Sequence, residues 1–219
     1  MYATDLESQN ISLGVSGLLW EGSLVMIDYE TKSLWSHILG EAMKGPLQGT
    51  KLKVIPSVMT DWGSWKTSHP ETTLVMMTRT ADSYVREYHS RDGGLLIGLV
   101  TNSGTEHWSF ADLFDKSPVN DVADDVPVAV SLDKHSFAAT IYDRRVDGRT
   151  LKFETRDGKI VDSETESVWD FLSGRATSGE LKGKQLKLLP GIVSDSAIWS
   201  LYYEYRDRSP PEKKKATTD

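Results

Sequence analysis

The strongest constraint on the fold of this chain is an internal repeat. Residues 28–65 align without a gap to residues 162–199, and roughly fifteen of the thirty-eight aligned residues are identical. The identical positions are mostly turn-forming residues and large aromatics, as where Trp35 aligns with Trp169. Residues of these kinds fix backbone geometry and fill cores, so we expect each copy to build the same structural unit.

The first part of each copy favours turns and strands. The stretches DYETKS and DSETES are typical of hairpin turns, since Asp and Ser side chains close local hydrogen bonds to the backbone. The segments that follow have apolar residues at helical spacing, but Gly40 and Gly174 interrupt them. Because glycine weakens a helix and often marks a bulge, we predict a curved strand here in both copies.

The last part of each copy predicts another strand. TKLKVIP and KQLKLLP alternate apolar and polar residues, which is typical of half-buried strands. A short helix is expected after the first copy, in DWGSWKTSH, where Thr60 or Asp61 is placed to cap the first amides.

The region between the copies predicts a mixture of strands with one helix. We expect strands in TTLVMMT and LLIGLVT, separated by the polar stretch TADSYVREYHSRDGG, and a short amphipathic helix in HWSFADLF. The three stretches PVAVSLD, FAATIYDRR and RTLKFETRDGKIVD then predict antiparallel strands joined by Asp-Gly turns.

The second copy therefore has a leading hairpin, and the first copy needs an equivalent. Residues 1–15 are the candidate for it, with Ile11 and Leu13 standing where Leu151 and Phe153 stand.

These patterns together predict an α+β fold that is mainly antiparallel β, with two pseudo-symmetric repeat halves and a few short helices. The expected organisation is a first repeat half at 1–78, a connecting segment with a short helix at 79–118, a second repeat half at 119–208 and a disordered tail at 209–219.

Composition narrows the classes of partner. A formal net charge of -7 argues against nucleic acid, because phosphate backbones are bound by clustered Lys and Arg. The chain has no cysteine, which excludes thiol catalysis and Cys-ligated metals. It also contains no apolar run approaching the roughly 20 residues of a membrane span and no visible signal peptide, so we expect no integral membrane segment.

Ordered motifs across nearly the whole chain carry a family resemblance. The runs GVSGLL, SLW, GEA and GPL occur in this order in the first half, and FAATIYDRRVDGRTLKFETRDGKIVDSETES follows in the second. In these motifs the chain resembles the prokaryotic family catalogued as domain of unknown function 3179. The resemblance implies a periplasmic or extracellular protein of the cell envelope, with a cytoplasmic location as the alternative where no signal peptide is seen.

The chain departs from that family pattern in two places. The family usually carries a Cys-Pro-Leu-Cys stretch upstream of the first repeat, and this chain has none, so no role of those cysteines transfers to it. A cluster of His and aromatic residues often closes the second half of the family. The corresponding stretch IVSDSAIWSLYYEYRD contains no His.

Candidate site residues come from the repeat. Asp28 and Asp162 occupy equivalent positions and form a candidate pair of acids for hydrolysis, although turn formation explains them more simply. His37 is the candidate imidazole, but its counterpart Phe171 favours packing over ligation. The histidines show no metal-ligand spacing, and we assign no catalytic residue, metal ligand or cofactor.

Aromatic residues supply the remaining candidates. Trp35 and Trp169 are placed to line a ligand groove, although repeated tryptophans more often fill a core. The speculative ligand-binding set is therefore Asp28, Trp35, His37, Asp162 and Trp169.

Two functions stay open at this point. The first is a non-enzymatic binding or structural module of the cell envelope, which takes an unknown small molecule or protein partner. The alternative is a carboxylate- or metal-dependent hydrolase-like enzyme with its site between the two repeat halves. The lack of a convincing catalytic constellation makes us lean away from an enzyme.

Overall fold

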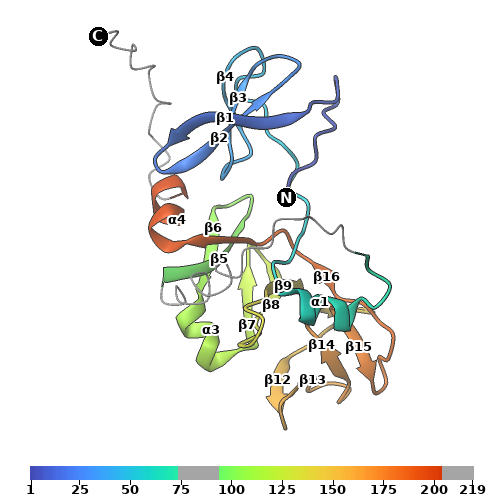
Figure 1. The fold of residues 1–219 in the computed structure, drawn as a ribbon. Helices are drawn as coiled ribbons and strands as arrows, with labels where there is room; N and C mark the ends of the chain where they lie inside the picture. The colour runs from blue at the N-terminus through green and yellow to red at the C-terminus, as the bar shows by residue number, and fades with distance from the viewer. Residues whose placement is uncertain (74–93, 204–219) are drawn as a thin grey trace, which may run out of the picture. The chain divides into compact units, whose positions relative to one another are not determined.

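The computed structural model describes residues 1–73 and 94–203 (Figure 1). Its backbone contacts divide the chain into two compact units. Unit 1 comprises Met1–Ile55 and the chain from Ala197, and unit 2 is Pro56–Ser196. The domain boundaries drawn from the sequence stay predictions. The tail at 209–219 and most of the predicted strand and polar stretch at 72–93 lie outside the described residues.

Unit 1 contains a four-stranded antiparallel sheet in the order β1-β2-β3-β4. Its strands are β1 (Leu13–Trp20), β2 (Ser23–Asp28), β3 (Leu34–Ser36) and β4 (Ala42–Lys44). The core beneath the sheet is a cluster of buried apolar side chains, Ile11, Trp35, Ala42 and Leu52.

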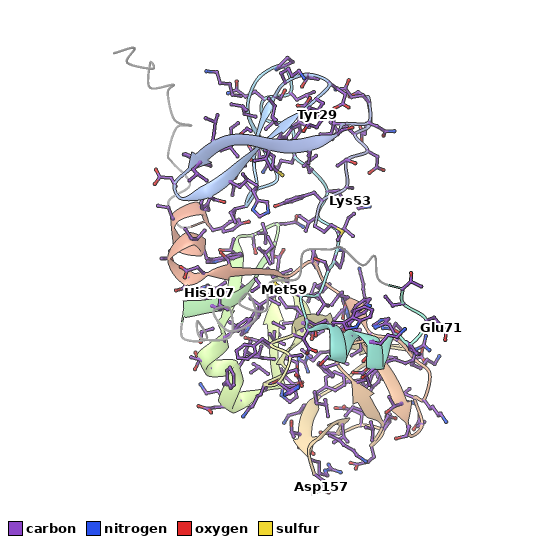
Figure 2. All side chains as sticks on the ribbon, viewed as in Figure 1. Tyr29, Lys53, Met59, Glu71, His107 and Asp157 are labelled. Atoms are coloured by element: carbon purple, nitrogen blue, oxygen red, sulfur yellow. The ribbon has the colours of Figure 1, made fainter. Side chains whose placement is uncertain are left out.

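Unit 2 contains a second sheet of the same kind, in the order β12-β13-β14-β15. Its strands are β12 (Phe153–Arg156), β13 (Lys159–Asp162), β14 (Val168–Asp170) and β15 (Arg175–Ser178). The turn between β12 and β13 is Asp157–Gly158, where both residues have positive φ, and Asp157 marks its tip in Figure 2. This Asp-Gly turn confirms the prediction from the sequence.

The rest of unit 2 forms two further antiparallel sheets, β16-β9-β8-β7 and β17-β5-β6. Their strands are β5 (Leu95–Val100), β6 (Thr105–Ser109), β7 (Val119–Ala123), β8 (Val126–Leu132), β9 (Ala139–Asp143), β16 (Lys187–Leu188) and β17 (Ile192–Asp195). A two-stranded ribbon pairs β10 (Arg145–Val146) with β11 (Arg149–Thr150). Apolar side chains from β5, β8 and β9 pack with Phe110 and Leu113 in one buried cluster.

The helices of the described part of the chain are short: α1 (Trp62–Ser68), α3 (Phe110–Lys116) and α4 (Ser196–Tyr203). Asp61 caps α1 by accepting a hydrogen bond from the Ser64 amide, as the sequence predicted. The fold is therefore α+β and mainly antiparallel β, which confirms the predicted class.

The structure corrects the predicted curved strands. In each copy the segment forms two short strands joined by a tight turn, in which Gly40 and Gly174 have φ of 61° and 70°. A Cβ atom on Gly174 would lie 2.6 Å from the ring of Tyr142, and one on Gly40 would lie 2.4 Å from the ring of Tyr2. Glycine is required here by both backbone conformation and close packing.

Two other local predictions were too long. Of HWSFADLF, the first three residues extend β6 and the helix begins at Phe110, because Ser109 accepts the Asp112 amide and caps it. TKLKVIP contains only isolated bridges, at Lys51 and Val54, while β16 in the second copy is a strand of two residues.

The leading hairpin of the first copy is β1–β2, which starts at Leu13, inside the stretch 1–15 expected from the sequence, but continues to Trp20 beyond it. Leu13 pairs with Asp28 in unit 1, as Phe153 pairs with Asp162 in unit 2. The structure extends this equivalence back to Tyr2, which bridges Val54 just as Tyr142 pairs with Leu188. The two copies therefore share the same local pairing from the leading hairpin to Val54 and Leu188, and they differ beyond it, where, within the described residues, only the second copy forms a strand, β17. Pseudo-symmetry between two halves stays a prediction.

Candidate functional site

Asp28 is the centre of a hydrogen-bonded turn. It ends β2, it is fully buried, and its carboxylate accepts bonds from the Thr31 amide (2.5 Å), the Ser33 amide (3.0 Å) and Trp35 Nε1 (2.9 Å). Burial by itself raises the pKa of Asp28, but the bonds from Trp35, Thr31 and Ser33 outweigh it and hold this pKa below its ordinary value. The carboxylate is consequently ionised in the folded protein.

Asp162 repeats this arrangement in unit 2. It ends β13, it is fully buried, and it accepts bonds from the Thr165 amide (2.6 Å), the Ser167 amide (3.2 Å) and Trp169 Nε1 (2.9 Å). In both copies the aspartate thus orders the turn and anchors the buried tryptophan. These contacts give the two aspartates and Trp35 a structural role, and their binding of a ligand stays a prediction.

His37 lies apart from this network. Its side chain is exposed directly after β3, its amide donates to the Leu24 carbonyl, and its carbonyl accepts from the Tyr2 hydroxyl at 2.9 Å. The structure therefore brings Asp28 together with Trp35, and Asp162 together with Trp169, but it does not add the imidazole to either pair.

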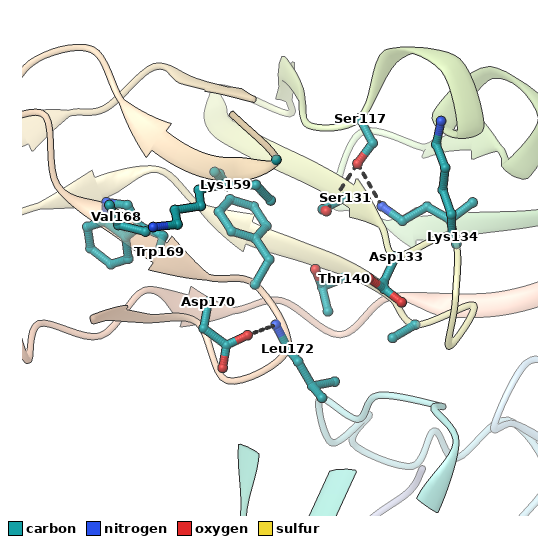
Figure 3. Close-up of a pocket in the computed structure, with 15 residues that line it drawn as sticks. Ser117, Ser131, Asp133, Lys134, Thr140, Lys159, Val168, Trp169, Asp170 and Leu172 are labelled. Carbon is teal, nitrogen blue, oxygen red and sulfur yellow. Dashed lines mark hydrogen bonds between the residues drawn. The ribbon is translucent and has the colours of Figure 1, made fainter. Parts of the chain in front are cut away.

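A pocket in unit 2 is the candidate functional site. It has a volume of about 340 Å³ and is bounded by β8 and β9 on one side and by β13 and β14 on the other (Figure 3). Its polar lining consists of Ser117, Ser131, Asp133, Lys134, Thr140, Lys159 and Asp170. Its apolar lining includes Leu132, Ala138, Ile160, Val168, Phe171 and Leu172. Trp169 is the one predicted site residue that contributes to this lining.

Thr140 is the most informative residue of the pocket. Its side chain is only 2% exposed, and its hydroxyl has no hydrogen-bond partner within the described part of the chain. The neighbouring hydroxyls differ, because Ser131 and Ser117 lie 3.1 Å apart and Ser117 also accepts the Leu132 amide. A buried polar group without a partner is costly, so the Thr140 hydroxyl is the position in this lining where a hydrogen bond from a ligand would be most favourable.

The second polar element of the pocket is a pair of acids. Asp133 accepts from the His135 and Ser136 amides through one carboxylate oxygen. Asp170 accepts from the Leu172 amide at 3.0 Å, a bond that Figure 3 shows at the pocket's edge. Asp170 also contributes to raising the pKa of the Tyr142 hydroxyl, after the larger effect of burial.

Sequence reasoning missed every pocket residue except Trp169. A signal was present at Ser131, which interrupts the otherwise apolar strand β8 at a buried position. Nothing in the sequence indicated that β8 and β9 face Asp170 and Leu172, which follow a hairpin some thirty residues later.

Metal binding finds no support in the described geometry. Within residues 1–73 and 94–203, His, Asp and Glu side chains do not gather in any group of three that could hold a metal ion. The same part of the chain contains no helix with the length and apolarity that a membrane span requires.

The fold and the pocket define a duplicated antiparallel-β protein with a cavity of small-molecule size in its second unit. Comparison with protein-family models then gives the family. The chain belongs to the family described as "Protein of unknown function (DUF3179)", whose model matches residues 1–94 and 90–204. This confirms the resemblance found in the sequence. Searches among curated proteins and among solved structures gave no match.

Proposed function

We propose that this protein is a non-enzymatic binding module whose ligand is a small molecule held in the pocket of unit 2. The observation that carries the proposal is the buried hydroxyl of Thr140, which lines the pocket and lacks a partner among the described residues. A ligand atom that bonds to this hydroxyl would remove the cost of leaving it unsatisfied.

The form of the pocket supports the same function. Its volume of about 340 Å³ lies at the lower end of the range of small-molecule sites, and it combines apolar walls with a few polar groups. Part of its wall, which includes Ser131, Thr140 and Trp169, comes from paired strands, which hold their side chains more rigidly than loops do. The buried aspartates of the two copies bond to backbone amides of their turns. This structural role favours a binding module over a hydrolase that uses these two carboxylates.

The test is a fragment screen followed by ligand-observed and protein-observed NMR on the full chain. We expect hits whose largest shifts fall on the amides of residues 131–140 and 168–172. The Thr140→Val variant, which keeps the side-chain shape and removes the hydroxyl, should weaken these hits by about tenfold, as expected for one hydrogen bond to a buried group.

Two controls make this screen decisive. Thr67→Val removes an exposed hydroxyl on α1 and should leave affinities unchanged. A screen in which no fragment shifts the pocket amides would contradict the proposal, and so would hits that bind Thr140→Val as tightly as the unmodified protein.

The location in the cell envelope is a further part of the proposal, and it rests on the family resemblance. If the protein also binds a protein partner, we expect that partner to be in the cell envelope. Fractionation of cells that express the native gene should place the protein in the periplasmic or extracellular fraction, and recovery in the cytosol would contradict this part alone.

A further inference from the structure

The pocket is lined by charged side chains of both signs. Two acids, Asp133 and Asp170, and two lysines, Lys134 and Lys159, belong to the lining. Formal neutrality is misleading here, because the position of each charged group decides which sign a ligand meets.

The two acids receive hydrogen bonds from neutral groups. Asp133 accepts from the amides and hydroxyl of its own turn, and Asp170 accepts from the Leu172 amide and the Ser173 hydroxyl. Among the residues that the structure describes, neither carboxylate forms a salt bridge. Each carboxylate has about four acceptor sites, so capacity for further donors is left on both.

Neither lysine of the lining forms an ion pair with these acids within the described residues. The ammonium of Lys134 lies 5.9 Å from the ring centroid of Phe114, on helix α3. Figure 3 shows the Lys134 side chain leaving the pocket and the Lys159 side chain extending toward Val168 and Trp169. Val168 and Trp169 belong to the lining, so the Lys159 charge stays at that end of the pocket, while the carboxylates of Asp133 and Asp170 are not paired with a cation in the described part of the chain.

We infer that the pocket accepts a small organic cation, a primary ammonium attached to a compact apolar group. This inference rests on the proposed function and names its ligand class. The ammonium has three donors and no acceptor, which suits the Thr140 oxygen and the carboxylates of Asp133 and Asp170. Bonds between an ammonium and a carboxylate are about twice as strong as neutral ones. The apolar group would lie against Leu132 and Ile160, within the apolar part of the lining.

The experiment compares three probes that share a phenyl ring and differ in the charge of the attached group. Benzylamine, benzyl alcohol and benzoate are titrated into the full chain at pH 7.5 by isothermal titration calorimetry and by NMR of the pocket amides. We expect benzylamine to bind at least tenfold more tightly than benzyl alcohol, with benzoate weakest because the carboxylates repel it.

Variants then locate the site of the ammonium. Asp170→Asn and Asp133→Asn each keep an acceptor oxygen for the local turn and remove one charge, and each should weaken benzylamine by about tenfold while leaving benzyl alcohol nearly unchanged. Asp147→Asn is the matched control, because it removes the same charge from an exposed turn of unit 2 outside the pocket lining. It should leave all three affinities unaltered, and unchanged NMR spectra elsewhere would verify folding.

The possible outcomes distinguish a failure of the cation assignment from a failure of the proposed binding function. If benzyl alcohol or benzoate binds the pocket as tightly as benzylamine, the cation assignment is overturned and the binding module stands. Pocket hits from the fragment screen that exclude amines would overturn the cation assignment in the same way. If neither the three probes nor any fragment shifts the pocket amides, the inference and the proposed function both fail.

Discussion

At the scale of single residues, the buried aspartates organise each copy. Asp28 accepts two backbone amides and an indole N–H over a span of eight residues, and Asp162 does the same in the second copy. A carboxylate can serve so many donors because it has about four acceptor sites. The repeated identity of Asp, Thr, Ser and Trp thus has a physical cause.

Removing the carboxylate of Asp162 should destabilise unit 2 strongly. In Asp162→Ala the amides of Thr165 and Ser167 and the indole of Trp169 lose their acceptor while they stay buried. We expect the free energy of unfolding to fall by about 3–5 kcal/mol, measured by urea denaturation. Glu180→Gln, which breaks an exposed ion pair with Arg149, is the control and should cost less than about 1 kcal/mol. A loss of that small size for Asp162→Ala would rule out the role given to this residue.

Asp28 predicts an acid dependence for unit 1. Its pKa in the folded state lies below the ordinary value, so its contribution to stability is present above the unfolded pKa of about 3.9 and is lost as the pH falls through the folded value. Stability measured from pH 6 to pH 2 should therefore decline. The decline should be shallower in Asp28→Asn, which has no proton to bind. Equal slopes for the two proteins would contradict the assignment.

At the scale of elements, a tyrosine that precedes each copy in the chain holds a turn of that copy. The Tyr2 hydroxyl donates to the His37 and Ile38 carbonyls, and the Tyr142 hydroxyl donates to the Phe171 and Leu172 carbonyls. The ring in each case fills the space left by a turn glycine. Tyr2 therefore holds the turn between β3 and β4, and Tyr142, which comes from β9 of a different sheet, holds the turn between β14 and β15.

Substitution of each tyrosine by phenylalanine should show how much its hydroxyl contributes to the free energy of unfolding. Tyr2→Phe and Tyr142→Phe keep the ring and remove the donor, and we expect each to lower the free energy of unfolding by about 1 kcal/mol in chemical denaturation. The exposed Tyr29 is the control, since Tyr29→Phe should change the free energy of unfolding by less than about 0.5 kcal/mol. A Tyr2→Phe effect no larger than that of the control would show that the first segment does not close unit 1.

Tyr2 also predicts an alkaline effect. Burial raises its pKa to about 12, so the stability that comes from the neutral phenol is complete below the unfolded pKa of about 10 and is lost between about pH 10 and 12. Spectrophotometric titration of the native protein and of Tyr2→Phe should therefore count the same number of phenols that ionise near pH 10, because Tyr2 does not ionise there in the folded protein. Ordinary titration of Tyr2 would contradict its buried position.

At the scale of the whole molecule, the two compact units have separate cores. Trp35 and its neighbours form the cluster of unit 1, and the clusters around Trp169 and Leu113 belong to unit 2. Regions with their own buried contacts can open as independent cooperative units.

Calorimetry should therefore resolve two unfolding transitions. We expect Asp28→Ala to lower the temperature of one transition and Asp162→Ala to lower that of the other, with little cross-effect, because the two aspartates bond to different groups and sites without shared partners are usually additive. Hydrogen exchange would assign each transition to its unit. A single transition that both substitutions shift equally would show that the chain unfolds as one cooperative body.

The sequence by itself determined the local structure of this protein. The repeat, the Asp-Gly turns, the cap at Asp61 and the strands from residue 126 to 162 all follow from short-range patterns, because turn chemistry and alternation act between neighbours in the chain. The predictions that were wrong were also local. At Gly40, for example, a residue with positive φ forms a turn that divides the predicted curved strand into two short strands.

Only the tertiary structure decided where the pocket lies and what surrounds Thr140. The hydroxyl of Thr140 is a candidate because Asp170 and Leu172, from a distant hairpin, line the same pocket and none of the described residues bonds to it. Tyr2 likewise acquires its role from Gly40 and Val54, far along the chain. Such contacts depend on long-range packing, which leaves no periodic signal in a single sequence, so the candidate site could be found only after the strands had been placed.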